Sequence, residues 1–126
     1  MASTLRIAAL LALSAVFAFA EEWSGSLVDS KCYASEERNV NPTDTLTNVD
    51  RDGNREIRFC SPSSKTKSFA VVHFDGRIFN LDSAGNAKAS DLVRTYRKRR
   101  PISVAISGEM VGEAFKVDSI SAAPQR

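Results

Sequence analysis

The sequence predicts a mainly β domain with five strands, one helix between the third and fourth strands, and a long loop after the first. Three observations support this fold class. Apolar and polar residues alternate along residues 102–107, as on a strand with one buried face. Asp75-Gly76 is a strong hairpin signal between two β-rich runs. Ser90 and Pro101 bound a segment whose apolar residues have helical spacing.

The N-terminus of the 126-residue chain has the pattern of an export signal. Arg6 supplies a positive charge, residues 7–19 form an uncharged run, and the small-x-small tripeptide ending at Ala20 fits a cleavage site. As a helix this run is about 20 Å long, shorter than the roughly 30 Å hydrocarbon core, which favours a cleaved signal (residues 1–20) over an uncleaved anchor. We expect a secreted or periplasmic protein with a single domain over residues 21–126, and no membrane-spanning segment.

The first strand is expected over residues 23–29. Residues 30–67 contain Asn-Pro, Asp-Gly and Ser-Pro pairs together with many Asn, Thr and Ser residues, all of which are turn signals. The sequence therefore predicts a long irregular loop over residues 30–67, with a short strand at Ile57 and Phe59 as its one regular element.

The middle of the chain has a more regular pattern. Residues 68–74 and 77–81 are expected to form a hairpin, and the polar residues 82–86 a turn. Ser90 is a suitable N-cap for the helix, and basic residues occupy its expected last turn, where they complement the helix dipole.

The C-terminal part is expected to form a second hairpin. Pro101 ends the helix, a strand covers residues 102–107, a turn covers residues 108–113, and a last strand reaches about Ser121.

Five strands with one helix between the third and fourth is the order of an OB-fold, a small Greek-key barrel. A barrel also removes exposed sheet edges. An open α+β sheet built from the same elements is the alternative. In the barrel, Trp23 at the head of the first strand is expected to plug one end, since it offers the largest single apolar burial.

Cys32 and Cys60 are the only cysteines. In an exported protein a lone pair of cysteines is most simply a disulfide. This bridge would span most of the long loop, closing about 28 residues, and would contribute roughly 3–4 kcal/mol. The alternatives are a redox pair or a metal site, but the spacing is unlike C-x-x-C, and the single His73 cannot complete a zinc set.

Three stretches of the chain resemble small secreted bacterial proteins of unknown function that carry a signal peptide and an OB-like β domain. They are Trp23-x-Gly25-x-Leu27-x-Asp29-x-x-Cys32, the hairpin over residues 74–81, and Val104-x-Ile106-x-Gly108 followed by Phe115-x-Val117. The closing strands are also loosely similar to the bacterial periplasmic OB-fold family implicated in stress tolerance. The disulfide-spanned loop departs from that family, and no catalytic residue carries over.

The net charge of +2 argues against a dedicated nucleic-acid binder. The one concentration of charge is the basic cluster, made up of Arg94, Arg97, Lys98, Arg99 and Arg100. Such a cluster suits phosphate, an acidic polysaccharide or an anionic membrane surface. The simpler interpretation is a solvated helix end. Stacking on single-stranded nucleic acid would need more aromatic residues than Tyr96, whose helical spacing with Leu92 indicates the core.

Residues 48–56 resemble the front half of a calcium loop. Oxygen-bearing side chains occupy loop positions 1, 3, 5 and 9, at Asn48, Asp50, Asp52 and Glu56. However, Phe59 stands where the bidentate Glu of such a loop belongs, which favours a solvated turn. We predict no metal site and no cofactor.

Catalytic patterns are few. His73 is the sole histidine, expected at the edge of the core, and no G-x-S-x-G motif surrounds a serine. Glu109 and Glu113 flank the last turn, where two acids are more often solvated than catalytic. In OB-folds the ligand face is formed by strands 2 and 3 with the adjoining loops, which directs attention to Phe74, Arg77, Phe79 and the long loop over residues 30–67.

These observations together predict an exported, non-enzymatic module that binds an anionic ligand or a protein partner in the cell envelope or outside the cell. The alternatives are a hydrolase that uses the long loop and His73, and a calcium-stabilised structural protein.

Overall fold

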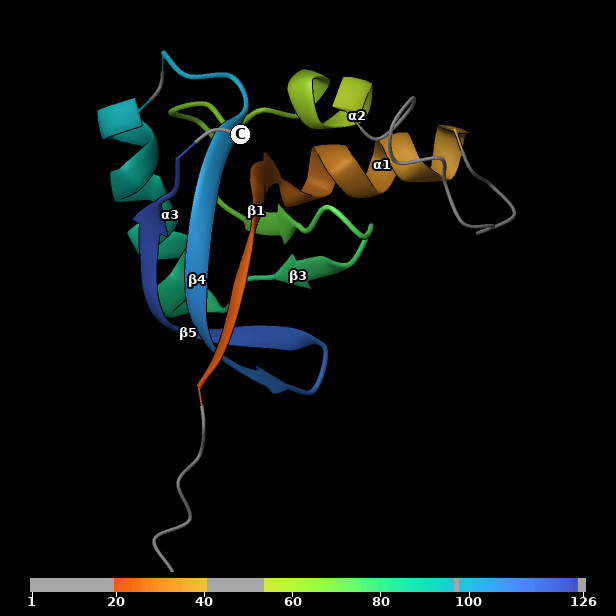
Figure 1. The fold of residues 1–126 in the computed structure, drawn as a ribbon. Helices are drawn as coiled ribbons and strands as arrows, with labels where there is room; N and C mark the ends of the chain where they lie inside the picture. Colours follow the sequence, from red (N-terminus) through yellow and green to blue (C-terminus); the bar gives the residue numbers. More distant parts are fainter. Residues whose placement is uncertain (1–19, 41–53, 97, 125–126) are drawn as a thin grey trace, which may run out of the picture.

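Five strands form one sheet in the order β3-β2-β1-β4-β5, and each pairing is antiparallel (Figure 1). The computed structural model describes residues 20–40, 54–96 and 98–124, so the expected export signal lies outside the described residues except for Ala20. The strands are β1 (Glu21–Asp29), β2 (Phe69–Val72), β3 (Ile78–Asn80), β4 (Ile102–Val111) and β5 (Ala114–Ala122).

The sheet curls into a half-barrel, so that its two edge strands approach each other. Leu81, directly after β3, forms an isolated parallel bridge with Phe115 of β5. Next to this bridge the backbone amide of Asp82 donates a hydrogen bond to the Phe115 carbonyl over 3.0 Å. The prediction of a mainly β domain with five strands is confirmed.

β1 is the central strand and pairs on both sides. Its first seven residues pair with β4, and its last four pair with β2. Gly25 lies where the two pairings meet, and a Cβ at this position would collide with the backbone carbonyl of Val72. The close approach of β2 to β1 therefore requires a residue without a side chain at this position.

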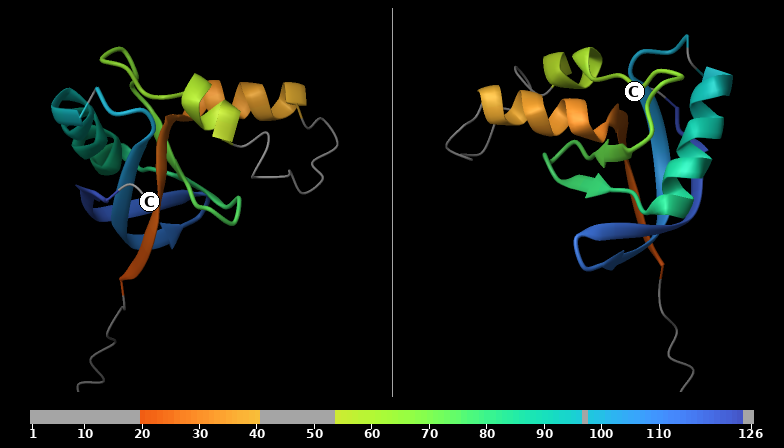
Figure 2. Two further views of the ribbon diagram at one scale, coloured as in Figure 1. Left: turned by 45° about the horizontal axis from the view of Figure 1, so that its top comes forward. Right: turned by 180° about the vertical axis from the view of Figure 1, so that it is seen from behind.

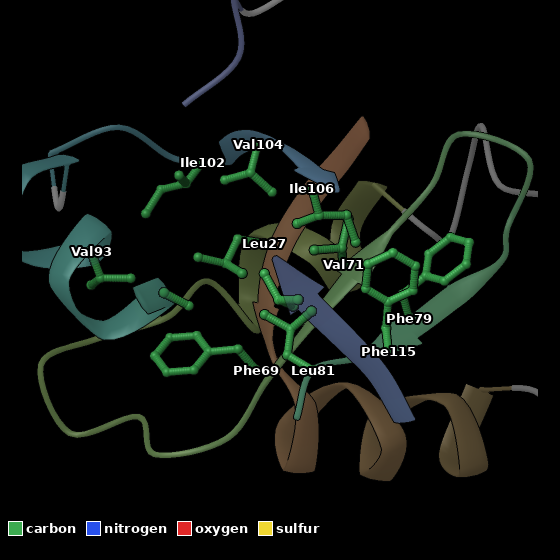
Figure 3. Packing of buried hydrophobic residues seen from close by; sticks show 12 residues of the cluster. Leu27, Phe69, Val71, Phe79, Leu81, Val93, Ile102, Val104, Ile106 and Phe115 are labelled. Carbon is green, nitrogen blue, oxygen red and sulfur yellow. The ribbon is translucent and has the colours of Figure 1, made fainter. Parts of the chain in front are cut away.

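The main core fills the concave side of the half-barrel (Figure 3). Alternate residues of β1, β2 and β4 point into it, because successive side chains of a strand lie on opposite faces. The core residues are Leu27, Phe69, Val71, Phe79, Leu81, Ala89, Val93, Ile102, Val104, Ile106, Phe115 and Val117.

α3 (Ser83–Tyr96) follows β3 in the chain and packs against the core through Ala89 and Val93. The expected start at Ser90 and the expected polar turn over residues 82–86 are wrong, because Asp82 is the residue that caps this helix. Its Oδ1 accepts a hydrogen bond from the backbone amide of Gly85 over 2.8 Å. Apolar residues with helical spacing occur only in the later part of α3. The sequence of its first two turns is therefore typical of a loop.

The expected irregular loop over residues 30–67 contains two helices, α1 (Ser30–Val40) and α2 (Asn54–Phe59), so the prediction of a single helix is wrong. Asp29 caps α1, with its Oδ1 accepting hydrogen bonds from the amides of Lys31 and Cys32 over 3.1 Å each. Few apolar residues lie on α1, so its sequence has no clear helical periodicity.

The short strand expected at Ile57 and Phe59 is also wrong, because both residues lie on α2. Residues two apart would share a face on a strand but lie on nearly opposite faces of a helix. Accordingly, Ile57 is buried and Phe59 is 71% exposed.

α1 and α2 lie on the opposite side of the molecule from α3, as both views of Figure 2 show. They cover the outer face of β1 and β2 and form a second, smaller core. This is why all four residues of β2 are buried, two against each core. The second core contains Val28, Tyr33, Ile57, Cys60, Ala70 and Val72.

The Cys32–Cys60 disulfide is confirmed, with the two Cα atoms 5.5 Å apart. It joins α1 to the residue that follows α2, and the backbone carbonyl of Cys60 accepts a hydrogen bond from the amide of Asp29 over 2.8 Å. The bridge and this bond together hold the two helices against the end of β1.

The last hairpin turns later than expected. β4 continues to Val111, so residues 108–111 are strand rather than turn, and only Gly112 and Glu113 connect it to β5. Gly112 has a φ of 62°, in the left-handed region that such a tight turn requires.

Candidate functional site

A pocket of about 590 Å³ opens between the chain segment at residues 64–67 and the first half of α3. Most of the residues that line it are of polar types, and two of them are lysines. The residues that line it are Ser64, Lys65, Thr66, Lys67, Ser83, Asn86, Ala87 and Ser90. The wall at residues 64–67 belongs to the long loop that the sequence indicates as a place to look for a ligand, but none of the eight residues was singled out, because neither wall contains a recognisable motif.

The wall at residues 64–67 has a defined conformation despite its exposure. The backbone amide of Thr66 donates to the carbonyl of Ser63 over 3.1 Å, and the amide of Ser63 donates to Thr66 Oγ1 over 3.0 Å. Thr66 Oγ1 in turn donates to Asp29 Oδ2 over 3.1 Å. Thr66 is therefore buried beneath the segment, while Lys65 and Lys67 on either side of it are exposed.

The α3 wall is positioned by polar contacts at the start of the helix. Asn86 Oδ1 accepts a hydrogen bond from the backbone amide of Phe69 over 2.9 Å, which ties the helix to β2 directly after the other wall. Asp82 Oδ1 accepts from Gly85 and also from the amide of Val117, over 3.3 Å, which ties the helix to β5. These contacts fix the separation of the two walls.

Among the described residues, the acidic side chains near the pocket pair with other groups and not with its two lysines. Asp29 and Asp82 are already hydrogen bonded to the protein, and Asp91 forms an ion pair with Arg94. No such bond in the described residues engages the side chains of Lys65 and Lys67. An anionic group in the pocket would have two lysine ammonium groups, three serine hydroxyls and the side-chain amide of Asn86 around it, and all of these can donate hydrogen bonds.

The basic cluster lies at the far end of the same helix, but of its described residues only Arg94 belongs to the last helical turn. α3 ends at Tyr96, so Lys98, Arg99 and Arg100 follow the helix, and Arg97 lies outside the described residues. Tyr96, half-buried against the core, is covered by the Arg99 guanidinium, 5.1 Å from its ring centroid. Arg94 is exposed and forms an ion pair with Asp91 over 3.4 Å.

The hairpin residues do not come together on one face. Phe79 is buried in the main core, with its ring centroid 5.5 Å from that of Phe115, whereas Phe74 is 80% exposed at the hairpin turn. The Arg77 guanidinium pairs with Asp75 over 3.1 Å and lies over the Trp23 ring, 5.2 Å from its centroid.

Trp23 is half-buried at the edge of the core rather than sealed inside it. Its ring centroid lies 4.8 Å from that of Phe79 and 5.1 Å from that of His73. The indole N–H donates to Glu21 Oε2 over 3.2 Å. Trp23 therefore links the core to the polar residues at the start of β1.

His73 lies in the same group of rings and is nearly buried. Its Nδ1 is 2.6 Å from the backbone carbonyl of Ser24, and because a carbonyl only accepts, Nδ1 carries the proton and donates. Its Nε2 lies 4.0 Å from Asp75 Oδ2. Within the described part of the chain, the ring nitrogens face a carbonyl and a carboxylate rather than a hydroxyl or thiol that could act as a nucleophile.

The calcium candidate falls largely outside the described residues, which exclude Asn48, Asp50 and Asp52. Glu56 lies on α2 and is buried. Among the residues that are described, no group of three or more His, Cys, Asp or Glu side chains is placed to hold a metal ion. Glu109 and Glu113 are both exposed near the last turn.

None of the helices in the described ranges has the length and apolar character needed to cross a membrane. Comparison of the chain with protein-family models, with curated proteins and with solved structures gave no match. The site must therefore be interpreted from its own residues.

Proposed function

We propose that the protein is an exported, non-enzymatic module that binds an anionic ligand in the pocket between residues 64–67 and α3. The observation that carries the proposal is that Lys65 and Lys67 line the same pocket as Ser83 and Ser90. Ammonium groups supply charge, and hydroxyls supply directional hydrogen bonds to carboxylate, sulfate or phosphate oxygens.

The proposed location rests on two independent features of the chain. The Cys32–Cys60 disulfide is typical of an oxidising compartment outside the cytoplasm. Residues 1–20 have the charge and apolar pattern of a signal peptide cleaved after Ala20. A protein delivered to the periplasm or secreted would meet envelope polymers and their fragments as ligands.

We also propose that the half-barrel is of the OB type. The order of the strands around the sheet and the parallel approach of the β3 and β5 ends at Leu81 and Phe115 support this assignment. The resemblance to small secreted bacterial proteins with an OB-like domain remains part of the proposal. The pocket nevertheless lies beside α3, away from the Phe74 and Arg77 hairpin where OB-folds commonly bind.

The experiment that tests the proposal is a titration of the isotope-labelled protein with glucuronate and with inorganic phosphate, followed by amide NMR. We expect the amides of residues 64–67 and 83–90 to shift together in a saturable way. The double variant Lys65→Glu/Lys67→Glu should lose the response. Lys116→Glu on β5 makes the same charge change per residue outside the pocket and should keep it.

A response confined to residues outside the pocket, or an unchanged response in the double variant, would contradict the proposed site. Saturable binding that converts the anion into a product would contradict the non-enzymatic role.

A further inference from the structure

The face of α3 that lines the pocket does not end with the pocket. An α-helix has 3.6 residues per turn, so positions three, four, seven and eleven residues apart lie close to one line along it. Ser83, Ala87 and Ser90 line the pocket, and Arg94 is the next residue on the same line. Arg94 therefore extends the polar wall of the pocket by one turn.

The remaining basic residues of the cluster follow the C-terminal end of this helix. The chain after α3 is held close to the helix end, because the amide of Arg99 donates to the carbonyl of Tyr96 over 2.9 Å. Lys98, Arg99 and Arg100 are all exposed there. From Ser83 to Arg94 the line covers roughly 16 Å at the 1.5 Å rise of a helix.

From this arrangement we propose that the ligand is an extended acidic polysaccharide, bound from the pocket along α3 to the basic cluster. This inference rests on the proposed function and adds the size and class of the ligand. A small anion would fill the pocket alone and would not extend to Arg94 or to the three basic residues after the helix. A chain with an acidic group on successive sugars meets Lys65 and Lys67 first, then Arg94, then the cluster.

Arg94 can exchange its present ion-pair partner for an acidic group of such a ligand. Its ion pair with Asp91 is exposed on both sides, and exposed pairs of this kind contribute little to stability. A ligand carboxylate that approaches along the line can replace Asp91 as the partner at small cost.

The chemistry of the walls favours a polysaccharide over a nucleic acid. Binding of single-stranded nucleic acid uses exposed aromatic rings on which bases stack. The one aromatic residue at the end of the helix is Tyr96, which packs against the core and is covered by Arg99. The walls offer instead the hydroxyls of Ser64, Ser83 and Ser90, which can pair with sugar hydroxyls.

The same surface is poorly suited to a membrane. Proteins that lie on an anionic bilayer insert apolar side chains beside their basic residues. In the described residues, the exposed large apolar side chains are those of Phe59, Phe74, Ile78, Met110 and Val111, and none of them lines the pocket or lies on α3.

The test measures the affinity of the purified full-length protein for galacturonate oligomers, as a dimer and as an octamer, by calorimetry at low and at moderate salt. We expect the octamer to bind more tightly than the dimer and to be more sensitive to salt. Arg94→Gln should weaken binding of the octamer about two- to fivefold, the effect of one exposed ion pair, and should leave the dimer unchanged. Lys98→Gln/Arg99→Gln/Arg100→Gln should weaken it further, and Lys116→Gln should match the wild type.

Three results would overturn the inference. Equal affinities for dimer and octamer, with Arg94→Gln silent, would leave the pocket as a site for a small anion and the proposed function intact. Tighter binding to a charge-matched single-stranded DNA, or to vesicles that contain anionic phospholipid, would replace the polysaccharide by that ligand. Failure of both oligomers and of glucuronate to bind would remove the proposed function as well.

Discussion

The Thr66 hydroxyl donates a hydrogen bond to Asp29 Oδ2 over 3.1 Å, and this contact joins the lysine-bearing wall of the pocket to the end of β1. Residues 29 and 66 are far apart in the chain, with both helices of the smaller core between them. The same Asp29 carboxylate caps α1 through its other oxygen. One side chain therefore organises the wall of the candidate site and the start of the helical layer.

Replacement of Thr66 by Val should loosen this wall without removing a charge. The variant keeps the shape of the side chain but leaves Asp29 Oδ2 and the amide of Ser63 without their partner, at a cost of about 1–3 kcal/mol in the free energy of unfolding. Affinity for the anionic ligand should fall as well. Urea denaturation and the glucuronate titration measure the two effects.

Thr95→Val is the matched control, since Thr95 is exposed on α3 and its hydroxyl donates only to the Asp91 carbonyl, over 3.4 Å. Equal effects of the two variants would show that the Thr66 contact has no special role.

Removal of the disulfide by Cys32→Ser/Cys60→Ser should lower the free energy of unfolding by roughly 3–4 kcal/mol, because the unfolded chain is no longer cross-linked. Cys60 is buried in the smaller core, so the loss should be concentrated in the helical layer. Hydrogen exchange should show α1 and α2 opening before β1 and β4. A thiol assay on the unreduced wild type should detect no free cysteine, and reactive thiols would contradict the bridge.

Phe115→Ala should be far more damaging than Phe74→Ala. Phe115 is fully buried, packs against Phe79, and lies at the bridge that brings the sheet edges together, so its truncation should cost about 3–5 kcal/mol. Phe74 is 80% exposed, and its truncation should change stability by no more than about 0.5 kcal/mol. Thermal unfolding of both variants checks the contrast, and a large loss from Phe74→Ala would indicate a contact that the structure does not show.

Stability should decrease above about pH 10 because of Tyr33. Burial raises the pKa of its phenol above the ordinary value of 10.0, and the negative charges of Glu37 and Glu56 raise the pKa further. The folded protein therefore keeps a proton that the unfolded chain loses, so this contribution is present below pH 10 and is lost as the pH rises above it. Tyr33→Phe should show a flatter decline in unfolding free energy above pH 10.

The ionisation itself can be observed directly. The chain has two tyrosines, so in a Tyr96→Phe variant the tyrosinate absorbance reports Tyr33 alone. We expect its midpoint to lie above pH 10, and a midpoint at or below that value would contradict the buried environment.

The strands of the second half were predictable because their side chains alternate. Residues 102–107 have one face in the core and one face half-exposed, and this arrangement is the pattern that a sequence displays. The Asp75-Gly76 turn was predictable for a local reason as well, since Gly76 has a φ of 93°.

The helices were harder to predict because long-range contacts decide them. α1 and α2 are short of apolar residues, and they are held by the disulfide and by the Asp29 cap. Residues 82–86 look like a polar turn, yet the hydrogen bonds of Asp82 to Gly85 and to Val117 make them the start of α3. Local propensity depends on the residues of the segment itself, so it carries no information about β5, the strand against which that helix packs.

The sequence by itself determined the mainly β class, the number of strands and the cysteine pair, because each depends on local alternation, on turn residues or on a count. It also identified Arg94 and the basic residues around it as the main concentration of charge. Only the tertiary structure decided which other residues lie beside the helix that carries Arg94. Lys65 and Lys67 reach α3 because Thr66 is bonded to Asp29 and Phe69 to Asn86, contacts between residues that are distant in the chain.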